Sequence, residues 1–527
     1  MPSINCCVGL IRVPKIIVAK SDLDDLIYAA GASCSPEKNC LPGTRQSIID
    51  EIVNWAHQPQ DNPSCQLLWL YGVAGSGKSA IAHTVAHRFD ACQRLGSSFC
   101  FDANQATRGP EHLFSTISRD LADFDNVWRI SLSNAVKGKK SIRGTHSVVL
   151  QFENFLVRPA ENLDIVGPVV IVIDALDECG DANSRKFILE ILETRLSELP
   201  GNFRIIVTSR PEPDIRKRLW SHPHILCKDM ADIGMSRSIK DVEIFIQREL
   251  GTAETSLSEH FPDWCAILAK KSDGLFQWAF TACSFIKQQG RLPHEYFDVI
   301  VKGSEGGDSQ LDNLYSQILH HSLLYQDATV LERFQTILGI VLTVKKPLLM
   351  STLGALCLEH NMDIVKSILM PLGAVLHGVT SESVPIYTLH TSFRDFLMNE
   401  NRSGIFHVEA KKANKNVTSG CLASMLNKLQ FNICQLQTSC ELNQDVVDME
   451  KRIKDHIPDD LSYACTFWAE HLEDSDYAGQ AEVNKFLNTK LLSWLEVLSV
   501  MGLTKSAMGS LQKLYRWTNV RCTWIKT

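Results

Sequence analysis

The chain has 527 residues, of which 45% are apolar and 21% are charged, and its formal net charge is −7. A chain of this length exceeds a single hydrophobic core and should divide into roughly three or four domains. The excess of acidic residues argues against a nucleic-acid-binding protein, which usually presents a basic face. No run of about 18 uncharged apolar residues occurs, so we expect a cytoplasmic protein without a transmembrane segment.

The 17 cysteines are scattered along the sequence, and none are arranged as C-x-x-C. Many lie within apolar runs, as Cys283 and Cys357 do, where a thiol acts as a small apolar side chain in a reducing compartment. The HPH triplet at 222–224 stands apart from other metal-binding residue types. The sequence therefore predicts no zinc site.

Residues 67–79 read LLWLYGVAGSGKS and contain the phosphate-loop pattern G-x-x-x-x-G-K-[ST] at 72–79. The apolar run at 67–71 predicts a buried parallel strand. After the loop, apolar residues recur at three- and four-residue spacing from 81 to 89, which predicts a helix. Strand, glycine loop and helix together form the arrangement that binds a nucleoside triphosphate.

The residue types of this loop suit phosphate binding. Its glycines let the backbone turn tightly and point several N–H groups at one phosphate, where the helix dipole adds positive charge. We expect Lys78 to reach the β- and γ-phosphates and the Ser79 hydroxyl to bind Mg²⁺. The residues predicted to bind the nucleotide are Gly72, Val73, Ala74, Gly75, Ser76, Gly77, Lys78, Ser79 and Ala80.

A second apolar run, VVIVI at 169–173, predicts a central strand, and Asp174 follows at its carboxyl end. An acid at that edge of a parallel sheet can hold Mg²⁺, usually through a water molecule. Glu178 is the better candidate to orient or deprotonate the attacking water; Asp177 could share that role, and the sequence does not separate the two. The alternative for these acids is a place at a helix N-terminus, where they would face the helix dipole.

FRIIVTSR at 203–210 predicts a third strand, and SSFCFD at 97–102 predicts a further strand of the same sheet. Arg210 could sense the γ-phosphate or stabilise charge during its transfer; the alternative is a capping or ion-paired arginine. Strands and helical stretches alternate from 65 to about 225, which predicts one doubly wound parallel α/β domain. No N-K-x-D motif for guanine occurs, so ATP/ADP is the favoured nucleotide, while GTP stays open.

Three segments, GVAGSGKSAIAHTVA, VVIVIDALDEC and RIIVTSRPEPDI, resemble the NACHT nucleotide-binding domain of the STAND class of signal-transduction ATPases. Others resemble the fungal NACHT proteins in particular. They are CLPGTRQSIIDEIVNWA (40–56), DGLFQWAFTACSFI (273–286), LDNLYSQIL (311–319) and LHTSFRDFL (389–397). The resemblance extends from about residue 38 to beyond residue 470.

This resemblance implies a P-loop NTPase domain followed by helical and winged-helix domains and a C-terminal α-helical region. The implied segments are a short N-terminal segment (1–37), a linker helix (38–64), the nucleotide-binding domain (65–225), a helical domain (226–300), a winged helix (301–405) and the C-terminal region (406–527). His390 is implied to contact the ADP β-phosphate and to lock a closed state. Relatives place a proline near the adenine in a G-L-P segment, where this chain has Gly274, Leu275 and Phe276.

The function that the resemblance implies is a switch that holds ADP when closed, exchanges it for ATP, hydrolyses ATP slowly and self-associates as a homo-oligomer, as in NLR-like innate immunity or heterokaryon incompatibility. The protein partners are unknown. Alternatives are a remodelling ATPase with sustained turnover, a scaffold with a structural nucleotide, or a small-molecule kinase. No 33-, 34- or 40-residue repeat is present, so we expect a switch core without sensor or effector, from a short paralogue or an incomplete gene model.

Overall fold

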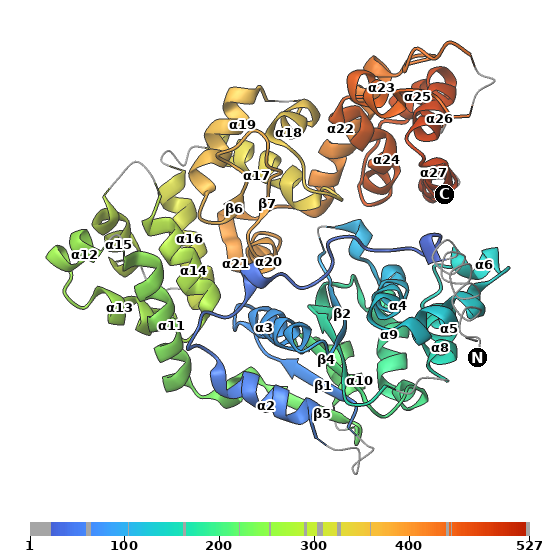
Figure 1. Cartoon of the computed structure of the whole chain (residues 1–527). Helices are drawn as coiled ribbons and strands as arrows, with labels where there is room; N and C mark the ends of the chain where they lie inside the picture. Colours follow the sequence, from blue (N-terminus) through green and yellow to red (C-terminus); the bar gives the residue numbers. More distant parts are fainter. Residues whose placement is uncertain are drawn as a thin grey trace, which may run out of the picture. The chain divides into compact units, whose positions relative to one another are not determined.

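The computed structural model is shown in Figure 1. It describes residues 23–58, 65–103, 105–161, 165–220, 222–251, 254–288, 292–302, 309–323, 328–358, 360–438, 442–443 and 445–522. Most of the predicted N-terminal segment therefore lies outside the described residues. The chain divides into two compact units, Met1–Phe280 and Thr281–Thr527, and each is described by itself.

The first unit is built on a five-stranded parallel sheet of order β2-β3-β4-β1-β5. Its strands are β1 (Leu67–Tyr71), β2 (Leu95–Cys100), β3 (Val169–Asp174), β4 (Phe203–Ser209) and β5 (Ile225–Asp229). β1, β3 and β4 are buried along their whole length, as continuous apolar runs predict for parallel strands covered on both faces. Because β4 lies between β1 and β3, the carboxyl ends of these three strands meet at one edge.

The sheet has a helical layer on each face, so the predicted doubly wound α/β fold is confirmed (Figure 1). Leu68 and Leu70 of β1 pack with apolar residues of α2 and α3. Leu67, Trp69 and Tyr71 point to the other face and pack with α4, α5 and α9. These helices are α2 (Gln46–Ala56), α3 (Lys78–Ala91), α4 (Leu113–Phe124), α5 (Asn126–Val136) and α9 (Ala182–Thr194).

Shorter helices connect these layers, and a group of helices follows the sheet. The connecting helices are α6 (Lys140–Arg143), α7 (Val148–Gln151), α8 (Arg158–Ala160) and α10 (Pro213–Leu219). The helices after the sheet are α11 (Met235–Leu250), α12 (Glu254–His260), α13 (Trp264–Lys271) and α14 (Phe276–Ile286). The boundary between the two units falls within α14.

The second unit begins with helices and a small antiparallel hairpin, formed by β6 (Leu376–His377) and β7 (Tyr387–Thr388). The helices around it are α15 (Pro293–Lys302), α16 (Gln310–Ser322), α17 (Ala328–Thr343), α18 (Met350–Leu356), α19 (Met362–Leu369), α20 (Thr391–Leu397) and α21 (Glu400–Ser403). Tyr315 of α16 packs edge-on against Phe393 of α20, and its hydroxyl is 2.8 Å from Ser392 Oγ. Two of the segments that carry the family resemblance therefore contact each other.

The rest of the second unit is helical in its described residues. Its helices are α22 (Ala410–Lys428), α23 (Met449–His456), α24 (Asp459–Glu473), α25 (Gln480–Thr489), α26 (Leu491–Val500) and α27 (Thr504–Cys522). α24 packs against both α22 and α27, and Trp468 and Trp494 are fully buried among these helices. Within the described part of the chain, no helix combines the length and apolar character needed to cross a bilayer.

Candidate functional site

The phosphate loop connects the end of β1 to the start of α3. Gly75 and Gly77 have φ angles of 79° and 95°, a region that favours glycine, and the helix begins at Lys78. Lys78 Nζ donates to the carbonyl oxygens of Gly72 and Val73, both at 2.9 Å. The loop therefore has the backbone turn that the sequence predicts, with its lysine folded over it.

Four predicted residues act electrostatically on Lys78. Burial lowers the pKa of Lys78 from its ordinary value, while the carboxylates of Asp177, Asp174 and Glu178 oppose that shift and Arg210 adds to it. The residues come from α3 and from the ends of β3 and β4. The structure thus brings the predicted lysine, acids and arginine together at one edge of the sheet.

Ser76 and Ser79 differ in their surroundings. Ser76 is buried, and its hydroxyl oxygen has no hydrogen-bond partner among the described residues. Ser79 is exposed on the first turn of α3, where the predicted Mg²⁺ ligand needs to reach the phosphates. A buried polar atom without a partner is costly, so the Ser76 hydroxyl is suited to a bound polar group.

Asp174 is the last residue of β3 and is only 3% exposed. The hydroxyl of Thr208, at the end of β4, donates to Asp174 Oδ1 and accepts a hydrogen bond from the backbone N–H of Ala175 at 3.0 Å. Ala175 has a φ angle of 57°, which turns the chain sharply after the strand. Thr208 therefore fixes both the carboxylate and the turn that follows it.

Asp177 and Arg210 form a close ion pair at the same edge. The backbone N–H of Arg210 donates to Asp177 Oδ1 at 3.0 Å, and its Nε donates to Oδ2 at 2.6 Å. Asp177 and Glu178 lie on a short 3₁₀ turn, Leu176–Glu178, that follows β3. The ion-paired alternative for Arg210 is thus present, and its partner is one of the predicted catalytic acids.

Two further contacts hold this edge in place. Arg185 of α9 donates to the carbonyl oxygens of Asp177 at 3.2 Å and Gly180 at 2.8 Å, while a two-point ion pair joins it to Asp214 of α10. On the other side, the indole N–H of Trp69 donates to Ser209 Oγ at 2.8 Å. The acidic turn and the end of β4 are therefore both braced by buried or half-buried polar groups.

A further residue near the phosphate loop is Arg45, which precedes α2 and is only 3% exposed. Its guanidinium donates to the Ser76 carbonyl at 3.0 Å and to Ser238 Oγ of α11 at 2.8 Å, and it lies 5.0 Å from the ring centre of Phe276. Its backbone N–H donates to Asp241. Arg45 therefore connects the phosphate loop to the helices after the sheet, a role that no local sequence pattern indicates.

Helix α14 also contacts the phosphate loop. The backbone N–H of Gln277 donates to the Gly75 carbonyl at 3.2 Å, and a Cβ placed on Gly75 would lie 2.5 Å from the Gln277 Cβ. Phe276 stands where the family resemblance implies a proline, and its ring lies 3.8 Å from the position of a Cβ on Gly77. The segment from Gly274 to Gln277 thus packs on the loop backbone.

His390 belongs to the second unit and forms the N-cap of α20. Its Nδ1 accepts the backbone N–H of Ser392 at 3.1 Å and lies 2.6 Å from Ser392 Oγ. Because Nδ1 accepts, a neutral imidazole carries its proton on Nε2. The contact between His390 and the ADP β-phosphate stays a prediction.

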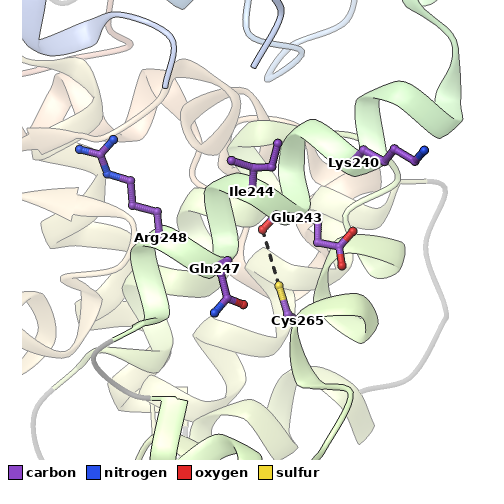
Figure 2. Close-up of a pocket in the computed structure, with 6 residues that line it drawn as sticks. All are labelled: Lys240, Glu243, Ile244, Gln247, Arg248 and Cys265. Carbon is purple, nitrogen blue, oxygen red and sulfur yellow. Dashed lines mark hydrogen bonds between the residues drawn. The ribbon is translucent and has the colours of Figure 1, made fainter. Parts of the chain in front are cut away.

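A pocket of about 650 Å³ lies along α11 (Figure 2). Cys265 of α13 reaches it, with its thiol 3.6 Å from the carbonyl oxygen of Glu243. The lining residues are Lys240, Glu243, Ile244, Gln247, Arg248 and Cys265. None of them belongs to the phosphate loop or the acidic turn, so this pocket is separate from the predicted nucleotide site.

Comparisons with known proteins add the following. A family model described as "Nephrocystin 3, N-terminal" matches residues 43–210. The vegetative incompatibility protein HET-E-1 of Podospora anserina is 23% identical; the match covers 91% of this chain and 37% of that protein. This chain therefore spans well under half the length of that relative.

Among solved structures, Drosophila ORC bound to DNA matches 69% of this chain and 95% of its own, with 11% identity and a TM-score of 0.28. Drosophila ORC bound to AT-rich DNA and Cdc6 matches 95% of both chains, with 11% identity and a TM-score of 0.24. Both TM-scores are too low to indicate a shared overall fold. The family-model match, the similarity across most of the chain and the phosphate-loop geometry together support a NACHT-type NTPase.

Proposed function

We propose that this protein is a STAND-type ATP/ADP-dependent switch that binds Mg-ATP, hydrolyses it slowly and self-associates in its ATP state. The observation that carries the proposal is the convergence of Lys78 with Asp174, Glu178 and the Asp177–Arg210 pair at one sheet edge. The similarity to an incompatibility protein over most of the chain supports the family from which the switch role is taken.

In this proposal the phosphate loop binds the nucleotide through its backbone N–H groups, and Lys78 neutralises the β- and γ-phosphates. Ser79 and Asp174, a hydroxyl and a carboxylate, are the hard oxygen donors that suit Mg²⁺, which supplies charge neutralisation on the phosphates when bound. Glu178 orients the attacking water. Arg210, held by Asp177, stabilises charge on the γ-phosphate.

The closed state in this proposal needs a contact from the second unit. The Nε2–H of His390 is a donor suited to a phosphate oxygen, because Nδ1 is already engaged by Ser392. A ligand shifts an equilibrium between two states only by its differential affinity for them. A contact made to ADP in the closed state alone would therefore stabilise that state.

The test is nucleotide retention by the purified full chain, measured by releasing bound nucleotide and separating it by chromatography, with steady-state phosphate release measured in parallel. We expect retained ADP, slow turnover, and loss of the nucleotide in Lys78→Ala. Rapid steady-state hydrolysis would contradict the switch and favour a working ATPase.

A second measurement tests whether His390 stabilises the closed state, which we call its latch role. The His390→Ala variant is expected to self-associate in ADP, where the unaltered chain stays in its closed form, as seen by light scattering after size exclusion. Unchanged self-association in this variant would rule out the latch role while leaving the nucleotide site intact.

A further inference from the structure

Three residues that are far apart in the sequence meet beside the end of β2. Cys34 lies before α2, His83 lies on α3, and Cys100 is the last residue of β2. The two sulfur atoms are 3.5 Å apart, and Cys100 Sγ is 3.9 Å from His83 Nε2. His83 and Cys100 are buried, whereas Cys34 is partly exposed. The positions of these residues in the sequence match no metal-binding or disulfide spacing, so only the fold brings them together.

The hydrogen bonding of His83 decides which chemistry the cluster suits. The backbone N–H of Ser35 donates to His83 Nδ1 at 2.7 Å, so a neutral imidazole carries its proton on Nε2. That N–H faces the Cys100 sulfur, where it can stabilise a thiolate. A metal-bound histidine normally has the opposite arrangement, in which its second nitrogen donates to a carboxylate or carbonyl oxygen.

The separation of the sulfur atoms alone does not distinguish a metal from a thiol pair. Two sulfur ligands of a tetrahedral zinc ion would be about 3.8 Å apart, close to the observed 3.5 Å. The proton on His83 Nε2 distinguishes a thiol pair from a metal site, because a metal ion would have to bind that nitrogen. The observations therefore favour thiol chemistry.

The backbones of the two cysteines are held next to each other. The N–H of Cys100 donates to the Ala32 carbonyl at 2.6 Å, and the N–H of Cys34 donates to Ser98 Oγ at 2.9 Å. These hydrogen bonds join Cys100 to Ala32 and Cys34 to Ser98, so they hold the two segments side by side. The sulfur atoms lie 3.5 Å apart and need to approach to about 2.05 Å to form a disulfide.

We propose that Cys34 and Cys100 form an oxidation site at which a peroxide converts the two thiols into a disulfide, with the His83 N–H stabilising the negative charge that develops on the Cys100 sulfur. The partly exposed Cys34 sulfur attacks one peroxide oxygen and gives up its proton, and the O–O bond breaks to give a sulfenic acid on Cys34 and one water. The Cys100 thiol then attacks Cys34 Sγ and gives up its proton, which joins the displaced hydroxide to form the second water. Overall, two thiols and one hydrogen peroxide give one disulfide and two waters.

The order of these two steps follows from accessibility and from proton affinity. The hydrogen bond that Cys100 shares with Cys34 and then burial raise the pKa of the Cys100 thiol well above its ordinary value. Cys100 is therefore poorly suited to meet the oxidant first, whereas Cys34 is partly exposed. This inference does not depend on the nucleotide chemistry proposed above.

The experiment uses the full chain, fully reduced and then titrated with hydrogen peroxide. Remaining thiols are alkylated, and the digested protein is analysed by mass spectrometry. We expect a Cys34–Cys100 cross-linked peptide to form before the exposed Cys92 is oxidised. Cys34→Ser and Cys100→Ser should each abolish that peptide, and oxidation of Cys92 ahead of the pair in the unaltered chain would overturn the proposal.

A matched pair of histidine variants tests the role of His83. His83→Leu removes the N–H that faces Cys100 and should slow disulfide formation about tenfold, the effect of losing one hydrogen bond to a charged group. His87→Leu changes an exposed histidine one turn further along α3 and should leave the rate unchanged. Equal rates in both variants would overturn the role of His83. If the reduced protein holds stoichiometric zinc and that zinc protects both thiols from oxidation, the cluster is a metal site and the disulfide proposal is overturned.

Discussion

Arg210 holds Asp177 at two points, through its backbone N–H on Oδ1 at 3.0 Å and through Nε on Oδ2 at 2.6 Å. A carboxylate bound at both oxygens by one residue is well placed to position that residue. We therefore propose that Asp177 positions Arg210 and that Glu178 handles the attacking water. This proposal gives different roles to two acids between which the sequence favours Glu178 without deciding.

The first prediction follows from that assignment. Glu178→Gln should preserve nucleotide binding and lower turnover by at least about 100-fold, since a positioned acid or base contributes about that much or more. Asp177→Asn and Arg210→Ala should each lower turnover, and the double variant should be no slower than the single ones because both act through one ion pair. Single-turnover hydrolysis measures all four. Unchanged hydrolysis in Glu178→Gln would move the water-handling role to Asp177.

The second prediction concerns the contact between the phosphate loop and α14. Gly75→Ala places a Cβ 2.5 Å from the Gln277 Cβ at a φ of 79°, so it should weaken nucleotide binding strongly. Gly43→Ala is the matched control, because its φ is 90° but nothing lies within 4 Å of the added Cβ. The Gly43→Ala control should lower the free energy of unfolding only by the strain of a left-handed backbone conformation, about 1–2 kcal/mol. Nucleotide affinity and thermal melting of both variants check the difference, and equal effects would contradict the packing argument.

The third prediction concerns Arg45, whose pKa burial lowers while Asp241 opposes that shift. Arg45→Met removes the charge but keeps much of the stem, and it leaves Asp241 without its buried cation. We expect a loss of about 3–5 kcal/mol in the free energy of unfolding, measured by urea denaturation, because one partner of a buried pair is left uncompensated. Arg88→Met breaks the exposed pair with Asp50 and should cost far less, because solvent-exposed ion pairs contribute little to stability. A similar loss of unfolding free energy in both variants would contradict the buried ion pair of Arg45.

The fourth prediction is a pH dependence of the second unit. Burial lowers the pKa of His471 from 6.5 to about 3, and the neutral ring bridges Tyr463 and Asn414 at 2.7 Å on each side. Below pH 6.5 the unfolded chain binds a proton that the folded chain does not, so stability is full above that pH and falls as the pH drops towards 3. The slope contributed is about 1.4 kcal/mol per pH unit.

The measurement is the free energy of unfolding between pH 6.5 and pH 4 for the unaltered chain and for His471→Gln. The His471→Gln variant should be less stable at neutral pH. Its free energy of unfolding should no longer show the decrease with falling pH that His471 contributes. His456→Gln, on α23 of the same unit, is the control and should keep the slope. An unchanged slope in His471→Gln would assign the acid sensitivity to other groups.

Much of the first unit can be predicted from sequence because its key signals are local. β1, β3 and β4 are buried on both faces, so their apolar runs identify them, and the phosphate loop is one continuous segment. β5 is missed because it is an edge strand in which only the first residue is buried, and its apolar run is only the three residues Ile225–Cys227.

The parts that escape prediction are contacts between distant segments. Thr208 donates a hydrogen bond to Asp174, which lies 34 positions away in the sequence, and Arg45 donates one to the Ser76 carbonyl, which lies 31 positions away. Such pairs depend on strand order and on helix placement, which periodicity does not encode. The Cys34–Cys100 cluster escapes for the same reason, because its members share no spacing that a metal or disulfide motif would show.

The end of β4 has a consequence that reaches beyond the residues near the nucleotide. Thr208, Ser209 and Arg210 are consecutive, and they bind Asp174, Trp69 and Asp177 respectively. A slip of one residue in a strand exchanges the faces on which its side chains lie. A one-residue slip of β4 would break all three hydrogen bonds at once. The hydrogen bond from Trp69 to Ser209 therefore helps to hold β4 in its register. A change at Trp69, deep in the core, should therefore impair hydrolysis as well as folding.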